Sequence, residues 1–381
     1  MAVRRLFLNP IWLVFSLPGY IGWRLLPALS DGPLTLLGGL MLLIIFCVII
    51  PLSVMSRSIR NRVLADRFAW VGLIAMGFFS SLFVLTLLRD VLLVTSQIFV
   101  LPAQWAGLAA TSARWTLALT VLITLLGLLV ARRRPGIVTV NIPIAGLPKA
   151  LDGFSIAQIS DVHVGPTIKR GFVQSIVKRV NGLHADLIAV TGDVVDGSVQ
   201  HLSEHTAPLA GLRARHGAYF VTGNHEYYSG EVAWTQEFRR LGLRVLKNEH
   251  VVLEHQGASL VLAGVTDYSA HHFDPAQRSD PAAALRGAPS HAGAKILLAH
   301  QPSSAAAAAG AGYDVQLSGH THGGQFWPWN FFIHFFQPFT GGLNRLQNLW
   351  VYVNRGTGYW GPPNRFGVPS EITHIRLVPA T

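Results

Sequence analysis

The sequence has 381 residues and only one cysteine, Cys47, so no disulfide can form within the chain and no metal site can be built from several thiolates. Charged residues are also few, at 13%, whereas 50% of the residues are hydrophobic, which is typical of a chain with membrane segments. Histidine is absent from residues 1–162, and all 16 histidines follow. Because histidine is the commonest metal ligand and a frequent acid–base catalyst, we expect such chemistry in the second part of the chain.

Acidic residues are scarce in residues 1–150, which carry three of them against thirteen basic residues, a net charge of +10. The remainder carries sixteen acidic and seventeen basic residues, a net charge of +1. The arginines of the first part flank apolar runs, as expected for membrane helices. The second part is nearly neutral and lacks the excess of basic residues that binds a nucleic-acid phosphate backbone, so we expect no nucleic-acid partner.

Four apolar stretches of the first part are long enough to cross a bilayer, which takes about 20 residues. They are Leu6–Trp23, Leu34–Met55, Phe68–Leu88 and Trp115–Ala131. A further stretch, Val91–Ala110, contains two glutamines and a proline, and we interpret it as an interfacial or re-entrant connection. The sequence therefore predicts a transmembrane anchor of about four helices in residues 1–135.

The arginines also indicate how these helices are oriented. With four spans, nine arginines lie on one side of the membrane and three on the other. Because cytoplasmic loops are rich in basic residues, both termini are expected in the cytoplasm. Alternatively, Arg4-Arg5 belongs to a twin-arginine export signal, which would place the second part outside. The three further spans and the lack of an evident small-residue cleavage site favour the cytoplasmic orientation.

After Pro135 the long apolar runs give way to short strand-like segments that alternate with helical ones, which predicts an α/β domain over residues 136–381. The predicted strands include Ile137–Ile142, Phe154–Ser160, Asp186–Thr191, Ala218–Thr222, Lys295–Ala299 and Asp314–Ser318. Helices are predicted at Lys169–Leu183, Trp234–Leu241 and Ser303–Ala309, and further strands at Arg244–Val265, Leu349–Asn354 and Ile372–Val378.

Polar side chains follow directly after five of these strands, and ligands of open α/β sheets bind at the carboxyl ends of strands. The segments are Asp161-Val162-His163, Gly192-Asp193, Gly223-Asn224-His225, His300 and Gly319-His320-Thr321-His322. Two aspartates, one asparagine and four histidines without a cysteine suit a pair of divalent ions such as Mn, Fe or Zn. Ions about 3.5–4 Å apart can clamp a phosphoryl group for in-line attack. Glycines beside the ligands would let the backbone turn sharply off each strand.

The order D-x-H, G-D-x-x-D, G-N-H-E, an isolated His and G-H-x-H resembles the calcineurin-like metallophosphoesterase superfamily over residues 160–325. The tail, Asn354–Gly358 and Pro369–Thr373, resembles a bacterial subgroup whose members often have N-terminal membrane segments. The resemblance implies a four-layer α-β-β-α sandwich of two mixed sheets between helices. It also implies an integral protein of the bacterial inner membrane, and the arginine distribution described above predicts that the domain lies on the cytoplasmic side.

The resemblance also assigns roles to residues. It implies that one ion is held by Asp161, His163 and His322, that a second is held by Asn224, His300 and His320, and that Asp193 bridges both. His225 would contact the phosphate and help protonate the leaving oxygen, with Asp196 orienting it. Asp196 could instead cap the helix expected after Gly197.

The implied activity is hydrolysis of a phosphate ester or pyrophosphate by a water molecule that the metals activate. The substrate could be a lipid or a lipid-linked molecule, because the segment Phe326–Phe336 is too aromatic for an ordinary loop. That segment either packs into the core or lies among lipid headgroups. The alternative function is a membrane-bound sensor or scaffold with a non-catalytic metal domain. The oligomeric state and the metal identity do not follow from the sequence.

Overall fold

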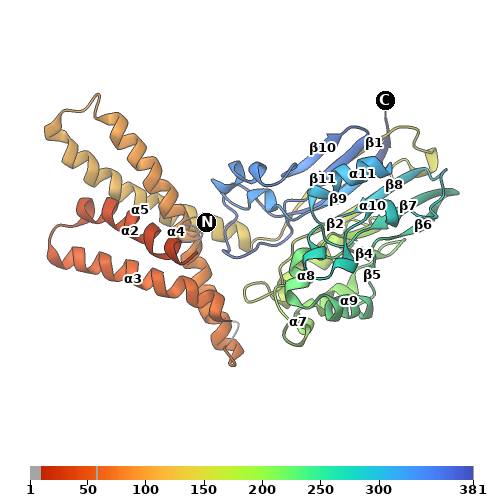
Figure 1. The fold of residues 1–381 in the computed structure, drawn as a ribbon, viewed down its shortest axis with the longest axis horizontal. Helices are drawn as coiled ribbons and strands as arrows, with labels where there is room; N and C mark the ends of the chain where they lie inside the picture. The colour runs from red at the N-terminus through yellow and green to blue at the C-terminus, as the bar shows by residue number, and fades with distance from the viewer. Residues whose placement is uncertain (1–9, 57–58, 381) are drawn as a thin grey trace. The chain divides into compact units, whose positions relative to one another are not determined.

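The structure is a computed structural model that describes residues 10–56 and 59–380 (Figure 1). The chain forms two compact units. The first extends to Leu129 and includes Gly361–Asn364, and the second comprises Val130–Trp360 together with the chain from Arg365 onwards. The domain boundary expected between residues 135 and 136 stays a prediction, because compactness alone does not show that either part folds by itself.

Long helices make up most of the described part of the first unit (Figure 1). They are α2 (Pro10–Leu29), α3 (Pro33–Met55), α4 (Arg62–Ser96) and α5 (Pro102–Arg132). Among the described residues, three helical stretches could cross a membrane by length and composition, namely Pro33–Ser53, Arg62–Ser96 and Ala103–Arg132. The predicted span Leu6–Trp23 lies partly outside the described residues. The stretch Val91–Ala110 forms no element of its own, because it completes α4 and begins α5 on either side of a turn.

Charged side chains near the end of α4 are paired within this helical unit. Arg24 Nε donates to Asp90 Oδ2 at 2.7 Å, and the Tyr20 hydroxyl donates to the same oxygen at 2.5 Å. The buried Arg89 donates from Nε to Ser112 Oγ at 3.0 Å. These bonds join α2, α4 and α5, and they reduce the cost of burying charge among apolar helices.

The second unit contains two six-stranded mixed sheets. The first has the order β1-β12-β2-β3-β4-β5, with β1 (Gly136–Ile144), β12 (Glu371–Pro379), β2 (Ser155–Ile159), β3 (Leu187–Val190), β4 (Ala218–Phe220) and β5 (Arg244–Val245). The second has the order β10-β11-β9-β8-β7-β6, with β10 (Gly342–Leu346), β11 (Leu349–Val353), β9 (Val315–Ser318), β8 (Ala294–Leu298), β7 (Ala258–Gly264) and β6 (Glu249–His255). Strands β2 to β5 run parallel, as do β7, β8, β9 and β11.

Helices cover the outer face of each sheet, and three apolar clusters hold the layers together. The helices are α6 (Arg170–Asn181), α7 (Val199–Thr206), α8 (Asn224–Ser229), α9 (Glu231–Arg240), α10 (Pro281–Ala284) and α11 (Ala305–Ala311). Between the sheets, Ile156 of β2 shares one buried core with Ile296 and Leu298 of β8. The outer clusters join the first sheet to α6, α7 and α9, and the second sheet to α10 and α11. The predicted four-layer α-β-β-α arrangement is therefore confirmed.

The local sequence explains these elements. In α6, Val173, Ile176, Val177 and Val180 recur at helical spacing and form its buried face. Every residue of β2 and of β3 is buried, as expected for central strands covered on both faces. Short parallel strands of this kind end abruptly in loops, and those loops carry the polar motifs.

We predict that Trp234→Ala in α9 lowers the free energy of unfolding by about 3–5 kcal/mol. Trp234 is fully buried, stacks on Phe238, and donates from its indole nitrogen to the Gly197 carbonyl at 2.8 Å. The melting temperature of the full chain in detergent measures the effect. Val232→Ala on the same helix is the control, because Val232 is 63% exposed. Equal melting temperatures for the two variants would contradict the prediction.

Candidate metal centre

Five strand ends bring the predicted site residues into one region. Asp161 and His163 follow β2, Asp193 follows β3, and Asn224 follows β4. From the second sheet, His300 follows β8, and His320 and His322 follow β9. Because β2, β3 and β4 are parallel neighbours, as are β8 and β9, their carboxyl ends lie side by side.

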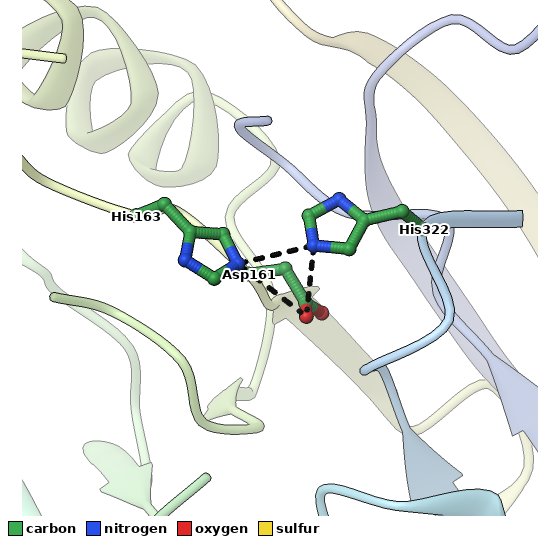
Figure 2. A group of neighbouring side chains, drawn as sticks. All are labelled: Asp161, His163 and His322. Atoms are coloured by element: carbon green, nitrogen blue, oxygen red, sulfur yellow. Dashed lines mark hydrogen bonds and ion pairs between the residues drawn. The ribbon is translucent and has the colours of Figure 1, made fainter. Parts of the chain in front are cut away.

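The first group consists of Asp161, His163 and His322, all of them buried. Figure 2 shows the two imidazoles and the carboxylate pointing toward one another. The Nε2 atoms of His163 and His322 are 3.0 Å apart, and Oδ1 of Asp161 lies 3.4 Å from the His322 nitrogen and 3.9 Å from the His163 nitrogen. Three ligand atoms in such a triangle could hold one ion.

The second group consists of Asp193, His300 and His320. Oδ2 of Asp193 lies 3.1 Å from Nε2 of His300, and the ring centroids of His300 and His320 are 5.1 Å apart. A third group joins Asp193 to His163 and His225. Asp193 thus shares one set with His300 and His320 and another with His163, which is a ligand candidate of the first group.

Two buried polar atoms support a cation at the second group. Asn224 Oδ1 and His300 Nε2 have no hydrogen-bond partner within the described structure. The Nδ1 atom of His300 donates to the Thr191 carbonyl at 2.7 Å, so Nε2 is the ring nitrogen that faces the Asp193 carboxylate. Leaving two such polar atoms buried is costly without a cation, and oxygen and nitrogen donors of this kind suit divalent transition metals.

His225 and Asp196 form the closest contact at this site. Nδ1 of His225 lies 2.5 Å from Oδ1 of Asp196, and Nδ1 of His163 lies 3.1 Å from the same oxygen. Burial lowers the pKa of His225, but the hydrogen bond to Asp196 and the negative charge of Asp193 outweigh it and raise this pKa to about 9. The following helix, α7, begins after Ser198, so the structure gives Asp196 histidine partners instead of a capping position.

The backbone is strained at most of the predicted ligands. Asp161, His163, Asp193, His320 and His322 all have positive φ angles, between 51° and 71°. A residue with a Cβ atom rarely adopts this left-handed conformation, and such strain is concentrated at functional sites. Asn224 and His300 do not share the feature, so it marks the turns after β2, β3 and β9.

Two glycines permit the close approach of these loops. A Cβ atom at Gly319 would overlap the Asp161 carboxylate, and one at Gly223 would overlap the Asp193 carboxylate. The backbone N–H of His320 donates to Asp161 Oδ2 at 3.0 Å, so the loop after β9 lies directly on that carboxylate. The close approach expected for glycines beside ligands is therefore present at both positions.

Glu226 and Arg365 are site residues that the sequence analysis missed. The Glu226 carboxylate is buried and accepts N–H groups from Asp193 at 2.9 Å, Val194 at 2.7 Å and Gly223 at 2.7 Å. It thereby ties the loop after β3 to the loop after β4. The only signal in the sequence was its place in G-N-H-E, where a surface position fits equally well.

Arg365 is also fully buried, although it lies far from the motifs in the sequence. Its guanidinium donates to the carbonyls of Arg355 at 2.7 Å and His322 at 3.2 Å, and to Nδ1 of His322 at 3.0 Å. A guanidinium can only donate, so the neutral His322 ring described here carries its proton on Nε2.

Exposed aromatic rings lie on one side of His225. The ring centroids of Trp360 and Tyr228 lie 5.7 Å and 5.3 Å from that of His225, and Phe273 lies 5.5 Å from Tyr228. Both hydrogen bonds between the Gln325 side chain and the Trp360 backbone are 2.8 Å long, which fixes the position of Trp360. The histidine with the raised pKa thus faces an apolar rim.

Two mixed sheets between helices, with aspartate and histidine clusters at the strand ends, define a metallophosphoesterase domain. The chain belongs to the calcineurin-like phosphoesterase family, whose model matches residues 154–324. Over 269 residues it is 38% identical to a "transmembrane protein with metallophosphoesterase domain" from Danio rerio. The aligned region covers 68% of this chain and 61% of that protein.

Bacterial relatives are similar over the same part of the chain. An uncharacterized metallophosphoesterase from Helicobacter pylori is 37% identical over 251 residues, or 65% of each chain. One from Aquifex aeolicus is 30% identical over 237 residues, or 61% of this chain and 87% of the relative. The matched regions span less than two thirds of the Danio rerio and Helicobacter pylori proteins. Family membership and the apolar helices together make this chain a membrane protein with a phosphoesterase domain.

We predict that Gly319→Ala lowers divalent-metal content and hydrolysis together, because the added methyl group displaces Asp161 from its position beside His322. Metal analysis of the purified full chain after equilibration with Mn²⁺ measures the loss. Gly310→Ala is the matched control, since a Cβ atom at Gly310 meets nothing within 4 Å. Full metal content in Gly319→Ala would show that the close approach is not needed.

Proposed function

We propose that this protein is a metal-dependent phosphohydrolase that binds two divalent ions and cleaves a phosphate ester or pyrophosphate. The observation that carries the proposal is the position of Asp193, which is grouped with His300 and His320 and also with His163. A carboxylate between two sets of nitrogen ligands is the arrangement that a bridging ligand needs. The proposed metals are Mn, Fe or Zn, because the donors are nitrogen and oxygen without sulfur.

The proposed ligands fall into two sets. Asp161, His163 and His322 would hold one ion, Asn224, His300 and His320 would hold the other, and Asp193 would bridge them. When bound, the ions would neutralise phosphoryl oxygens and lower the pKa of a water molecule toward about 7. Glu226 would keep the bridging position fixed, since it accepts the backbone N–H of Asp193 itself.

His225 is proposed to give a proton to the leaving oxygen. The hydrogen bond between Nδ1 and the Asp196 carboxylate stabilises the protonated ring, which lies at the edge of the site with its side chain 14% exposed. Asp196, which contacts Nδ1, would hold the ring so that the Nε2–H points toward the ligands, where Nε2 lies 3.9 Å from Asp193 Oδ2. In this proposal His225 acts as the general acid, and Asp196 orients its ring.

The substrate is proposed to be a phosphate ester. More specifically, we propose a lipid phosphate or a lipid-linked phosphate. The apolar rim of Trp360, Tyr228 and Phe273 beside His225 supports a leaving group with apolar surface. We place the protein in the bacterial inner membrane with this domain on the cytoplasmic side, on the basis of the arginine distribution.

We predict that chelation abolishes hydrolysis of bis(p-nitrophenyl) phosphate and that added Mn²⁺ restores it.

We also predict that Asp193→Asn binds fewer ions than the parent chain. The amide is a poorer bridging ligand than the carboxylate because it lacks the negative charge. Metal content per chain measures the loss. The control is Asp152→Asn, since Asp152 is exposed and lies in a loop outside the clusters. Full metal content combined with no hydrolysis would favour the sensor or scaffold alternative.

We predict that His225→Ala retains its metals but loses about 10²–10⁴-fold in kcat for an ester with a poor leaving group. The loss should be smaller for p-nitrophenyl esters, because that leaving oxygen departs without a proton. The ratio of the two losses separates proton donation from a purely structural role. His291→Ala, at an exposed position, is the control. Equal losses on both esters would contradict the assignment.

A further inference from the structure

Five aromatic side chains beyond the metal centre form an exposed group, here called the aromatic ridge. The ridge consists of Trp329, Phe331, Phe332, Phe335 and Phe336, which are 38%, 58%, 47%, 72% and 78% exposed. The ring centroids of Trp329 and Phe332 are 6.0 Å apart, and those of Phe332 and Phe335 are 6.4 Å apart. A contiguous apolar surface of this kind on a folded domain marks an interaction site.

The ridge has a well-defined base. Phe326 is buried, and the backbone N–H of Trp327 donates to the Phe366 carbonyl at 2.9 Å. On the other side, Ser303 Oγ donates to the Gln337 side chain at 2.9 Å. Both ends of the segment are therefore fixed, whereas two short helical turns, η8 (Trp329–Phe331) and η9 (Ile333–Phe335), carry the rings outward.

The ridge stands next to His322, a member of the first group of the metal centre. The turn η7 (His322–Gly324) contains His322 and contacts η8. A Cβ atom at Gly324 would overlap the backbone of Asn330, so the chain folds back tightly on itself between His322 and the ridge. Whatever the ridge contacts is thereby brought close to the metal centre.

The chain itself indicates a lipid bilayer as the partner. Helix α5 is long and apolar enough to cross a membrane and ends at Arg132, and β1 begins at Gly136. An extended connection of this length reaches roughly 14 Å, so the second unit begins at a membrane surface. Exposed Arg133 and Arg134 in the connection complement anionic headgroups, and the segment Phe326–Phe339 contains no acidic residue.

We propose that the aromatic ridge inserts into the headgroup region of the bilayer that anchors the chain. Tryptophan and phenylalanine side chains are favoured at that depth. The contact holds the His322 side of the metal centre at the membrane surface, and it does not depend on the reaction catalysed there. It accounts for an aromatic cluster that neither the core nor the proposed ligands use.

A single-cysteine experiment on the full chain in phospholipid nanodiscs tests the proposal. In a Cys47→Ser background, an environment-sensitive fluorophore is attached at Phe335→Cys or Phe336→Cys. The control is Val252→Cys on β6, where the native side chain is 41% exposed. We expect lipid-attached doxyl quenchers to quench the ridge probes several-fold more strongly than the control probe, with blue-shifted emission. Unchanged melting temperatures identify variants that remain folded.

Two outcomes overturn the proposal. Equal quenching at the ridge and at residue 252 would mean that the ridge stays in water. Probes that are shielded from aqueous iodide but not reached by doxyl lipids would mean that another protein surface, such as a second copy of the chain, covers the ridge. Because quenching requires no turnover, neither outcome can be confused with a failure of the proposed hydrolysis.

Discussion

The arrangement of this domain depends on concentrating buried polar atoms that do not all find a partner within it. Asn224 Oδ1 and His300 Nε2 are buried without hydrogen-bond partners, whereas the Nε2 atoms of His163 and His322 share one hydrogen bond at 3.0 Å. Such a cluster opposes folding unless cations or protons occupy it. The surrounding structure supplies the rigidity that holds it together, through the two sheets and the tight loops at their carboxyl ends.

Glu226 and Arg365 show how that rigidity is distributed. Glu226 is a buried carboxylate that accepts three backbone N–H groups from two loops. Arg365 is a buried guanidinium that donates to the backbone carbonyls of His322 and Arg355. Neither occupies one of the proposed ligand positions. Together they fix the positions of Asp193 and His322, so the strained φ angles at those residues are maintained by their neighbours.

The sequence predicted the α/β class and most elements of the second unit, because β2, β3, β8 and β9 are short, consist at least half of apolar residues, and are bounded by glycine or polar turns. It was less informative in the first unit. Composition alone placed a break near residue 89, whereas α4 continues to Ser96, because a paired Arg89 and Asp90 can remain within a helix. The strand β10 and the role of Glu226 also escaped prediction, since both depend on contacts distant in the sequence.

The order and chemistry of the motifs determined which residues could bind metals, because residue types and their positions after predicted strands are properties of the sequence itself. Residue types and spacing did not show which of them come together; the resemblance implied the groupings, and the tertiary structure brings Asp161 together with His163 and His322, and Asp193 with His300 and His320. It also decided that Asp196 contacts two histidines and that the aromatic ridge is exposed. The reason is physical: distances between loops follow from the order and register of strands in two packed sheets, and no local pattern encodes them.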